Sequence, residues 1–403
     1  MHCRACDSPG LMSIIPLGEI PLANALLREV RAKSEPRYNL EVMLCPKCGL
    51  AQLKDLVDPQ HLFSDYVYFS SNSETMLHSA AQCVERIIPT LPSNALIIEI
   101  ASNDGYLLKN YVTNKIAVLG IDPAQNIAKV ANEKGIPTLC EFFNENLANK
   151  LMAQGKQADV IHANNVMAHV PDIKGFIKGL KILLKPSGIA VIEVPYFADL
   201  VEKLEFDTIY HEHVYYFSVK PLAAAFKSAG LELYNLEKLN IHGGTLRLFV
   251  GHQGAHQVQP ILAQMIQHEE KSGLYDHRSY AHFMSKLATL KHQLVNLLLQ
   301  LKKEGKKIAA YGASAKGTTL LNFFGVSGAL IDFVVDRSQT KQGQFTPGTH
   351  LLIRHPQALI DDKMDYALLL VWNFVDEILA QQSAFTQNAG KFIIPLPTVE
   401  IIA

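Results

Sequence analysis

The chain has 403 residues, of which 48% are hydrophobic and 19% are charged, and its formal net charge is -1. A chain of this length exceeds one ordinary hydrophobic core, so two or three domains are expected. The neutral balance argues against nucleic acid or an anionic membrane as partner, because both require an excess of Lys and Arg.

No segment approaches the roughly 18 apolar residues of a membrane-spanning helix. The N-terminal segment MHCRACDSPG also lacks the regions of a signal peptide. We therefore expect a cytoplasmic protein. In such a reducing compartment paired cysteines favour metal binding over disulfides.

Two CxxC pairs open the chain, Cys3 with Cys6 and Cys45 with Cys48. Each pair can place two thiolates on one tight turn, and two such turns complete the closed tetrahedral shell of structural zinc. The segment between the pairs then has to fold out as a hairpin or loop. Reduced cysteines without a ligand and a redox-active CxxC are the alternatives. We expect a zinc-binding domain over residues 1–74.

Residues 75–252 show the pattern of a doubly wound α/β domain. After a predicted helix over 75–88, buried strands are expected at ALIIEI, IAVLGID, IPTLCEF, ADVIHAN and GIAVIEVP, with helices over 123–134 and 173–184. Continuous apolar strands alternating with helices indicate a parallel sheet covered on both faces. LELYNLEKL and TLRLFVG are predicted to add an antiparallel edge.

Residues 253–403 begin with a helical region that extends to residue 303. The segment KIAAYGASAKGTTLLNFF then predicts a strand, a turn and a helix, and LIDFVVD and DYALLLVWN predict further strands. The pattern indicates a second, Rossmann-like parallel α/β domain.

The turn EIASNDG, residues 99–105, follows the first strand of the 75–252 domain, where open parallel sheets bind their ligands. Asp122 ends the next strand and can accept both hydroxyls of an adenosine ribose. The turn lacks the GxGxxG spacing that approaches a pyrophosphate. It therefore favours S-adenosylmethionine over a nicotinamide or flavin dinucleotide, and a closed structural turn is the other alternative. The expected ligand contacts are Glu99, Ala101, Asn103, Asp104, Gly105, Asp122, Pro123 and Asn164.

The turn YGASAKG offers a second ligand position at the N-terminus of a predicted helix. The helix dipole and free amides attract anions there, and Lys316 adds a positive charge. Asp336 closes the next strand and is again placed for a ribose. A phosphate-bearing nucleotide is favoured at this turn over the first one.

The segment YHEH, residues 210–213, follows the fifth strand and lies on the same edge of the sheet as His169. A histidine can remove a proton from a carbon next to a carbonyl, and a carboxylate or tyrosine can orient that histidine. A catalytic metal bound by His211 and His213, and a buried or capping role for both, are the alternatives. Spacing alone does not choose between these two histidines.

Eight motifs in this order resemble the sugar C-methyltransferases of deoxysugar pathways: the paired CxxC, YVYFSS, EIASNDG, GIDPA, YHEHVYYFS, HGGTLRLF, YGASAKG and TPGTHLLI. The resemblance spans nearly the whole chain. It implies N-terminal zinc and a class I methyltransferase domain that binds S-adenosylmethionine. It also implies a C-terminal domain that grips the nucleotide of a dTDP- or GDP-linked 4-keto-6-deoxy sugar, in a monomer.

By this resemblance His213 is the base at carbon 3 of the sugar, and Tyr210, Glu212, His169 and Tyr66 surround it. The residues expected to contact the sugar or its nucleotide are Tyr68, Ser71, His242, Arg247, Gly312, Ser314, Lys316 and Asp336.

The family commonly has glycine at the position of Ala101, so we expect Ala101 to keep a negative φ. A sugar O-methyltransferase and a non-catalytic nucleotide-binding protein are the alternative functions.

Overall fold

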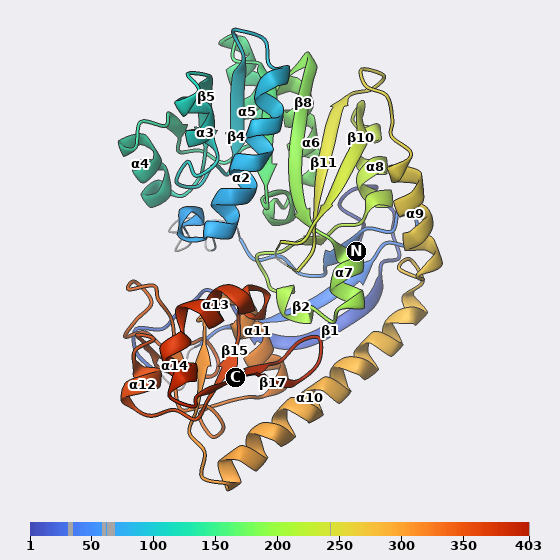
Figure 1. Ribbon diagram of the computed structural model, residues 1–403. Coiled ribbons are helices and arrows are strands. Elements are labelled where there is room, and N and C mark those ends of the chain that lie inside the picture. Colours follow the sequence, from blue (N-terminus) through green and yellow to red (C-terminus); the bar gives the residue numbers. More distant parts are fainter. Residues whose placement is uncertain (31–34, 59–61, 63–68, 242, 403) are drawn as a thin grey trace.

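The computed structural model describes residues 1–30, 35–58, 62, 69–241 and 243–402. Within these residues the strands form three sheets, which Figure 1 shows in chain order from blue to red. None of the described helices is long and apolar enough to span a membrane.

The N-terminal sheet has the strand order β1-β2-β3-β9. Strands β1 (Met12–Pro21) and β2 (Arg37–Leu44) pair antiparallel, as expected for a segment that folds out between the cysteine pairs. Strand β3 (Ala51–Leu53) pairs with β9 (Tyr215–Tyr216), which is separated from the end of YHEH by one residue. The segment with the predicted catalytic residues therefore completes the N-terminal sheet.

The central sheet has the order β10-β11-β8-β7-β4-β5-β6. The chain runs outward from β4 to β6 and then returns to the other side of β4 at β7, so the switch point lies between β4 and β7. Strands β11 and β10 add the predicted antiparallel edge. The bounds are β4 (Leu96–Ile100), β5 (Ala117–Ile121), β6 (Thr138–Leu139), β7 (Ala158–Asn164), β8 (Leu184–Pro195), β10 (Leu231–Leu239) and β11 (Thr245–His252).

Three helices of the central domain begin where the side chain of the N-cap residue accepts a free amide. Ser73, Asn144 and Asp172 cap α2, α5 and α6 in this way. Helix α4 starts two residues later than predicted, because the Asp122 carboxylate accepts the Ala124 amide and keeps that residue extended. The bounds are α2 (Glu74–Ile87), α3 (Leu108–Thr113), α4 (Gln125–Glu133), α5 (Glu145–Ala153), α6 (Ile173–Leu183), α7 (Phe197–Glu202) and α8 (Val219–Ser228).

The C-terminal sheet has the order β14-β13-β12-β15-β16-β17, with its switch point between β12 and β15. The bounds are β12 (Ile308–Tyr311), β13 (Val334–Val335), β14 (Ile353–Arg354), β15 (Tyr366–Leu369), β16 (Lys391–Ile394) and β17 (Glu400–Ile402). Its helices are α11 (Ala315–Phe324), α12 (Ala358–Asp361), α13 (Val375–Gln381) and α14 (Ser383–Gln387).

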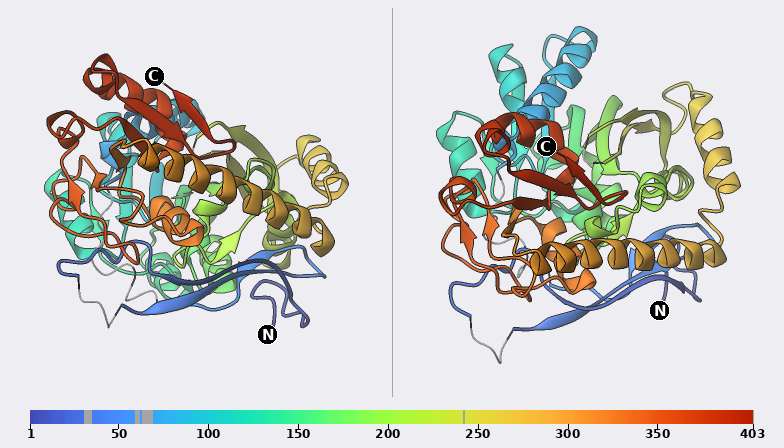
Figure 2. Two further views of the ribbon diagram at one scale, coloured as in Figure 1. Left: turned by 90° about the horizontal axis from the view of Figure 1, so that it is seen from below. Right: turned by 60° about the horizontal axis from the view of Figure 1, so that its bottom comes forward.

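Helices α9 (Ile261–Lys271) and α10 (Tyr280–Lys303) connect the central and C-terminal sheets. Buried residues such as Leu287, Leu290 and Leu294 recur along α10 at the spacing of one helical face. Both views in Figure 2 show α10 beside the β1–β2 hairpin, so this face packs in the shared core.

The carboxylate of Glu269 on α9 caps α8 from outside. It is buried and accepts the amides of Val219 at 2.7 Å and Lys220 at 3.2 Å. We predict that Glu269→Ala lowers the free energy of unfolding by about 2–3 kcal/mol, because two amides at a buried helix start lose their acceptor. Urea denaturation measures the change.

The neighbouring Glu270 gives the matched control, because its carboxylate forms an exposed ion pair with Lys220. Glu270→Ala is expected to cost less than about 1 kcal/mol. Equal losses in the two variants would contradict the capping role of Glu269.

Candidate active site and metal centre

Four cysteines form a compact thiol cluster in the N-terminal domain. The Sγ atoms of Cys3, Cys6, Cys45 and Cys48 all lie within 4.8 Å of one another. Two of the Sγ–Sγ distances are 3.6 and 3.7 Å. A tetrahedral zinc ion with Zn–S bonds of about 2.3 Å requires S–S edges of about 3.8 Å. The cluster therefore fits zinc with four thiolates and no open position for a substrate.

The predicted methyl-donor turn lies at the carboxyl ends of β4 and β5. The Asp122 carboxylate accepts the Asn103 amide at 2.9 Å, and the Asn103 side-chain oxygen accepts the Ser70 amide at 2.8 Å. The Asp104 carboxylate accepts the Ser71 hydroxyl and the Lys134 ammonium. These bonds bring Asn103, Asp104, Asp122 and Ser71 together around one turn.

Several buried acceptors at this edge have no partner among the described residues: both Glu99 carboxylate oxygens, the Ser102 hydroxyl and the Asn164 side-chain oxygen. Burial and the nearby carboxylates of Asp122 and Asp104 raise the pKa of Glu99 well above its ordinary value. Buried polar groups ordinarily have partners, so the edge fits a ligand that brings hydroxyl or amino donors. S-adenosylmethionine carries both. Pro123 follows Asp122 directly at the end of β5.

The expected negative φ of Ala101 is wrong, because Ala101 has φ 55° and Asn103 has φ 49°. The Ser102 amide donates to the Ile121 carbonyl, and the Asn103 amide donates to Asp122. These bonds determine the turn from both sides. They hold Ala101 in the left-handed region at a cost of roughly 1–2 kcal/mol.

Both ring nitrogens of His213 have a hydrogen-bond partner in the segment that contains YHEH. Its Nδ1 lies 2.9 Å from the Thr208 carbonyl oxygen, and its Nε2 lies 2.8 Å from the Tyr210 hydroxyl. A carbonyl oxygen only accepts, so Nδ1 carries the proton of the neutral ring and Nε2 carries the lone pair. This is the tautomer of a general base with Nε2 as the reacting atom.

The His169 ring packs against His213 with 4.8 Å between the ring centroids. Its Nδ1 donates to the Glu212 carbonyl oxygen at 2.8 Å. Burial lowers the pKa of His169 to about 4, so the ring is neutral near pH 7. A neutral neighbour does not repel a positive charge that forms on His213.

The two histidines of YHEH differ in their surroundings. His211 is buried against the N-terminal sheet, where its Nε2 lies 3.2 Å from the Tyr38 carbonyl oxygen. Its ring lies 5.8 Å from the Tyr38 ring, and burial lowers its pKa. His211 therefore packs two domains together, whereas His213 faces His169.

Glu212 was predicted to orient a histidine, and it contacts His169 through its main-chain carbonyl and not through its carboxylate. Its carboxylate accepts the Asn24 side-chain amide at 2.6 Å, and the Thr208 carbonyl orients His213 instead. Burial raises the pKa of Glu212 from an ordinary value near 4.5 to about 7.

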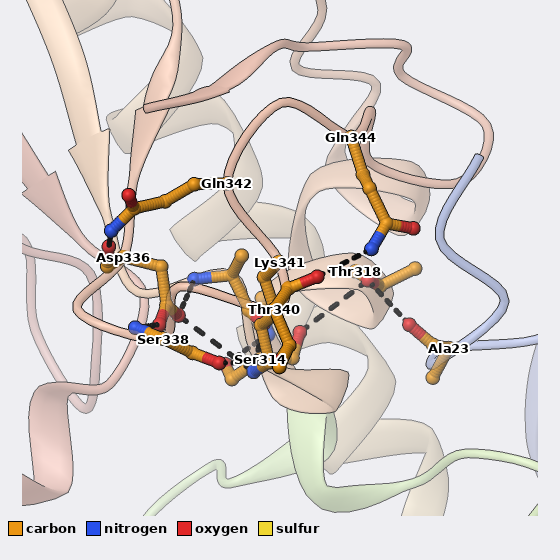
Figure 3. Close-up of polar contacts among 11 residues, drawn as sticks. Ala23, Ser314, Thr318, Asp336, Ser338, Thr340, Lys341, Gln342 and Gln344 are labelled. Carbon is orange, nitrogen blue, oxygen red and sulfur yellow. Dashed lines mark hydrogen bonds and ion pairs between the residues drawn. The ribbon is translucent and has the colours of Figure 1, made fainter. Parts of the chain in front are cut away.

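The second predicted turn is built like the first. The Asp336 carboxylate accepts the amides of Ala313 and Ser338, each at 2.8 Å, and Lys341 lies 3.7 Å away (Figure 3). Gly312 has φ 96°, and the Ser314 hydroxyl caps α11 by accepting the Gly317 amide. Asp122 and Asp336 thus hold equivalent turns in the two sheets.

Two of the predicted substrate contacts, Lys316 and Arg247, have partners within the protein. The Lys316 ammonium lies 4.6 Å from the centre of the Trp372 ring and donates to the Asn373 side chain. Arg247 lies in a buried ion pair, with its Nη2 2.7 Å from the Glu193 carboxylate. These are contacts within the protein, and Lys316 and Arg247 remain predicted ligand contacts. Tyr66, Tyr68 and His242 lie outside the described residues.

Sequence reasoning missed the residues that orient the site through the main chain. Thr208 offers its carbonyl to His213, and Thr319 and Trp372 of the C-terminal domain contact the same segment. Every residue has a main-chain carbonyl, so the residue type does not show which carbonyl orients a side chain. The aromatic side chain Trp372, at the end of a predicted strand, was the one available signal.

Comparison with known families divides the chain into three matched regions. Residues 3–63 match a "Putative zinc binding domain", residues 73–236 a "Methyltransferase domain" and residues 240–397 a "C-methyltransferase C-terminal domain". With the thiol cluster and the doubly wound sheet, these matches confirm the predicted fold class and zinc.

C-methyltransferase NovU of Streptomyces niveus is 33% identical over 408 residues, which cover 100% of this chain and 97% of that protein. Ubiquinone biosynthesis O-methyltransferase of Bartonella bacilliformis is 31% identical over only 24% of this chain and 39% of that protein. The structure of magnesium protoporphyrin IX methyltransferase from Synechocystis PCC 6803 with bound SAH shares 13% identity and covers 44% of this chain and 83% of that chain. Its TM-score of 0.35 is too low to support a conclusion.

Replacing one thiol tests the metal centre. We predict that Cys45→Ser lowers bound zinc and solubility, because three thiolates and a hydroxyl leave the tetrahedral shell incomplete. Elemental analysis of the purified protein measures the zinc. Cys140→Ser is the control, because Cys140 is exposed and outside the cluster. Unchanged zinc in Cys45→Ser would contradict the four-thiolate site.

The raised pKa of Glu212 predicts a stability that depends on pH. Between its unfolded and folded pKa values the folded chain binds more protons, so stability falls as pH rises through about 7. Glu212→Gln keeps an oxygen for Asn24 and does not titrate. We predict that it reduces this fall between pH 5.5 and 7.5 by up to about 2 kcal/mol.

Denaturant unfolding at both pH values measures the difference. Glu304→Gln, at an exposed position, serves as the control. If the wild type and Glu212→Gln lose the same free energy of unfolding between pH 5.5 and 7.5, Glu212 is not buried as a neutral acid.

Proposed function

Because the chain belongs to the family of C-methyltransferases that carry an N-terminal zinc-binding domain, we propose that its methyl acceptor is carbon 3 of a dTDP- or GDP-linked 4-keto-6-deoxy sugar. The chain is an S-adenosylmethionine-dependent enzyme that forms a carbon–carbon bond. In this proposal residues 1–74 bind zinc, residues 75–252 bind the methyl donor and residues 253–403 bind the nucleotide sugar.

The observation that carries this proposal is the tautomer of His213. Its Nε2 lone pair lies on the edge of the sheet that also bears the methyl-donor turn. A ketone makes the neighbouring C–H bond acidic, so His213 takes the proton of carbon 3 and the electron pair moves onto the keto oxygen. The resulting enolate carbon is the nucleophile.

Two donors near Nε2 can stabilise the enolate oxygen. The first is the Tyr210 hydroxyl, which lies 2.8 Å from Nε2, and the second is the N–H that forms when His213 accepts the proton. His169 bonds the Glu212 carbonyl through Nδ1 and is neutral near pH 7, so it keeps the site free of a second positive charge.

Glu99 and Asp122 would hold S-adenosylmethionine, which would supply an electrophilic methyl group to the enolate carbon and would become S-adenosylhomocysteine. His213 then releases its proton to solvent. The nucleotide of the acceptor is assigned to the turn at Gly312, Ser314 and Asp336. Its amides and the start of α11 suit an anion.

Transfer of a labelled methyl group tests the proposed acceptor. The enzyme is incubated with labelled methyl donor and a panel of dTDP- and GDP-linked 4-keto-6-deoxy sugars, and the label is located by NMR. Label on carbon 3 supports the proposal. Label on oxygen would identify a sugar O-methyltransferase, and binding without transfer would favour a non-catalytic nucleotide-binding protein.

The role of His213 gives a separate prediction. His213→Ala is expected to bind the methyl donor but to abolish deuterium exchange at carbon 3 of the accepted sugar, because the base is lost. NMR in D2O measures exchange and calorimetry measures binding. His282→Ala, on the exposed face of α10, is the control. Exchange that continues in His213→Ala would assign the base to another residue.

A further inference from the structure

The segment that leads to His213 is packed against helix α11 of the C-terminal domain. Phe206 is fully buried, and its ring lies 5.3 Å from the ring of Phe323 and 4.9 Å from that of Phe324. Both partners belong to α11. The contact joins the loop after α7 to helix α11, which follows it by more than a hundred positions in the sequence.

Two hydrogen bonds anchor the same segment on either side of Thr208. The Trp372 indole N–H donates to the Asp207 carboxylate at 2.7 Å, and the Thr319 hydroxyl donates to the Ile209 carbonyl at 3.1 Å. Asp207, Ile209 and Thr319 are fully buried. Thr208 therefore lies between two residues whose positions are set by the C-terminal domain.

The carbonyl of Thr208 is the acceptor that orients His213. If Thr208 moves, Nδ1 loses its acceptor and the neutral ring no longer prefers the tautomer with the lone pair on Nε2. A small displacement of a reacting group is enough to reduce the rate strongly. The two anchors thus act on the base through the main chain, without touching it.

We propose that Thr319 and Trp372 are positioning residues that hold the Thr208 carbonyl and thereby set the tautomer of His213. This proposal builds on the function proposed above, in which His213 is the base. In this proposal the C-terminal domain has two functions. Helix α11 begins at the turn assigned to the nucleotide, and its side chains also contact the segment that leads to His213. Lys316, in the first turn of α11, contacts the ring of Trp372 with its ammonium group.

The test compares Thr319→Val, which removes the hydroxyl at nearly constant volume, with Thr319→Ser, which keeps it. Long-range 1H–15N NMR of the histidine rings reports the tautomer, and the signal that disappears in His213→Gln identifies His213. We expect the Nδ1–H tautomer in the wild type and in Thr319→Ser. In Thr319→Val we expect a mixture of tautomers, with kcat at least about tenfold lower and the KM of the methyl donor unchanged.

Thr346→Val is the matched control, because Thr346 is a buried threonine of the same domain whose hydroxyl bonds the Leu351 amide and not the catalytic segment. It is expected to keep the tautomer and kcat. Trp372→Phe tests the other anchor and is expected to mix the tautomers as Thr319→Val does, so the proposal stays testable if one variant does not fold.

A wild-type His213 with its proton on Nε2 would overturn the proposal, as would an unchanged tautomer in both Thr319→Val and Trp372→Phe. The tautomer is measured without substrate. Failure of the proposed methyl acceptor is therefore distinct from failure of this inference, since it would leave the NMR result intact.

Discussion

The hydrogen bond from His213 to the Thr208 carbonyl is the interaction on which the site depends, and all three sheets contribute to it. Strand β9 attaches the end of the catalytic segment to the N-terminal sheet, His169 bonds the Glu212 carbonyl from the central domain, and α11 holds the residues before Tyr210. A loop of this length would not hold one conformation alone, because each ordered residue loses conformational entropy. Packing of the segment against all three domains compensates for this loss of conformational entropy.

The two α/β domains use one device to build their ligand edges. In each, an aspartate at the end of the second strand accepts the amide of the turn after the first strand and the amide two residues after itself. The segments that follow β8 and β15 meet where Trp372 donates a hydrogen bond to Asp207. A donor at one edge and a nucleotide at the other would therefore share a single region around His213.

Much of this arrangement follows from local sequence patterns. Continuous apolar strands predict the parallel sheets, CxxC spacing predicts the metal centre, and the aspartates Asp122 and Asp336 are predicted at the ends of strands. What local patterns do not predict is non-local. The φ of Ala101, which was predicted wrongly, the ion pair of Arg247 and the different surroundings of His211 and His213 each depend on a main-chain group or charge from a distant segment, which no local pattern encodes.

The most direct test of the account is a crystal structure of the enzyme with S-adenosylhomocysteine and an accepted nucleotide-linked 4-keto sugar. The account predicts carbon 3 of the sugar within about 3–3.5 Å of His213 Nε2 or of the donor sulfur's methyl position, the range of reacting atoms held for attack. It also predicts the nucleotide at the turn before α11. A sugar bound with carbon 3 away from His213, or with the two ligands in separate clefts, would contradict it.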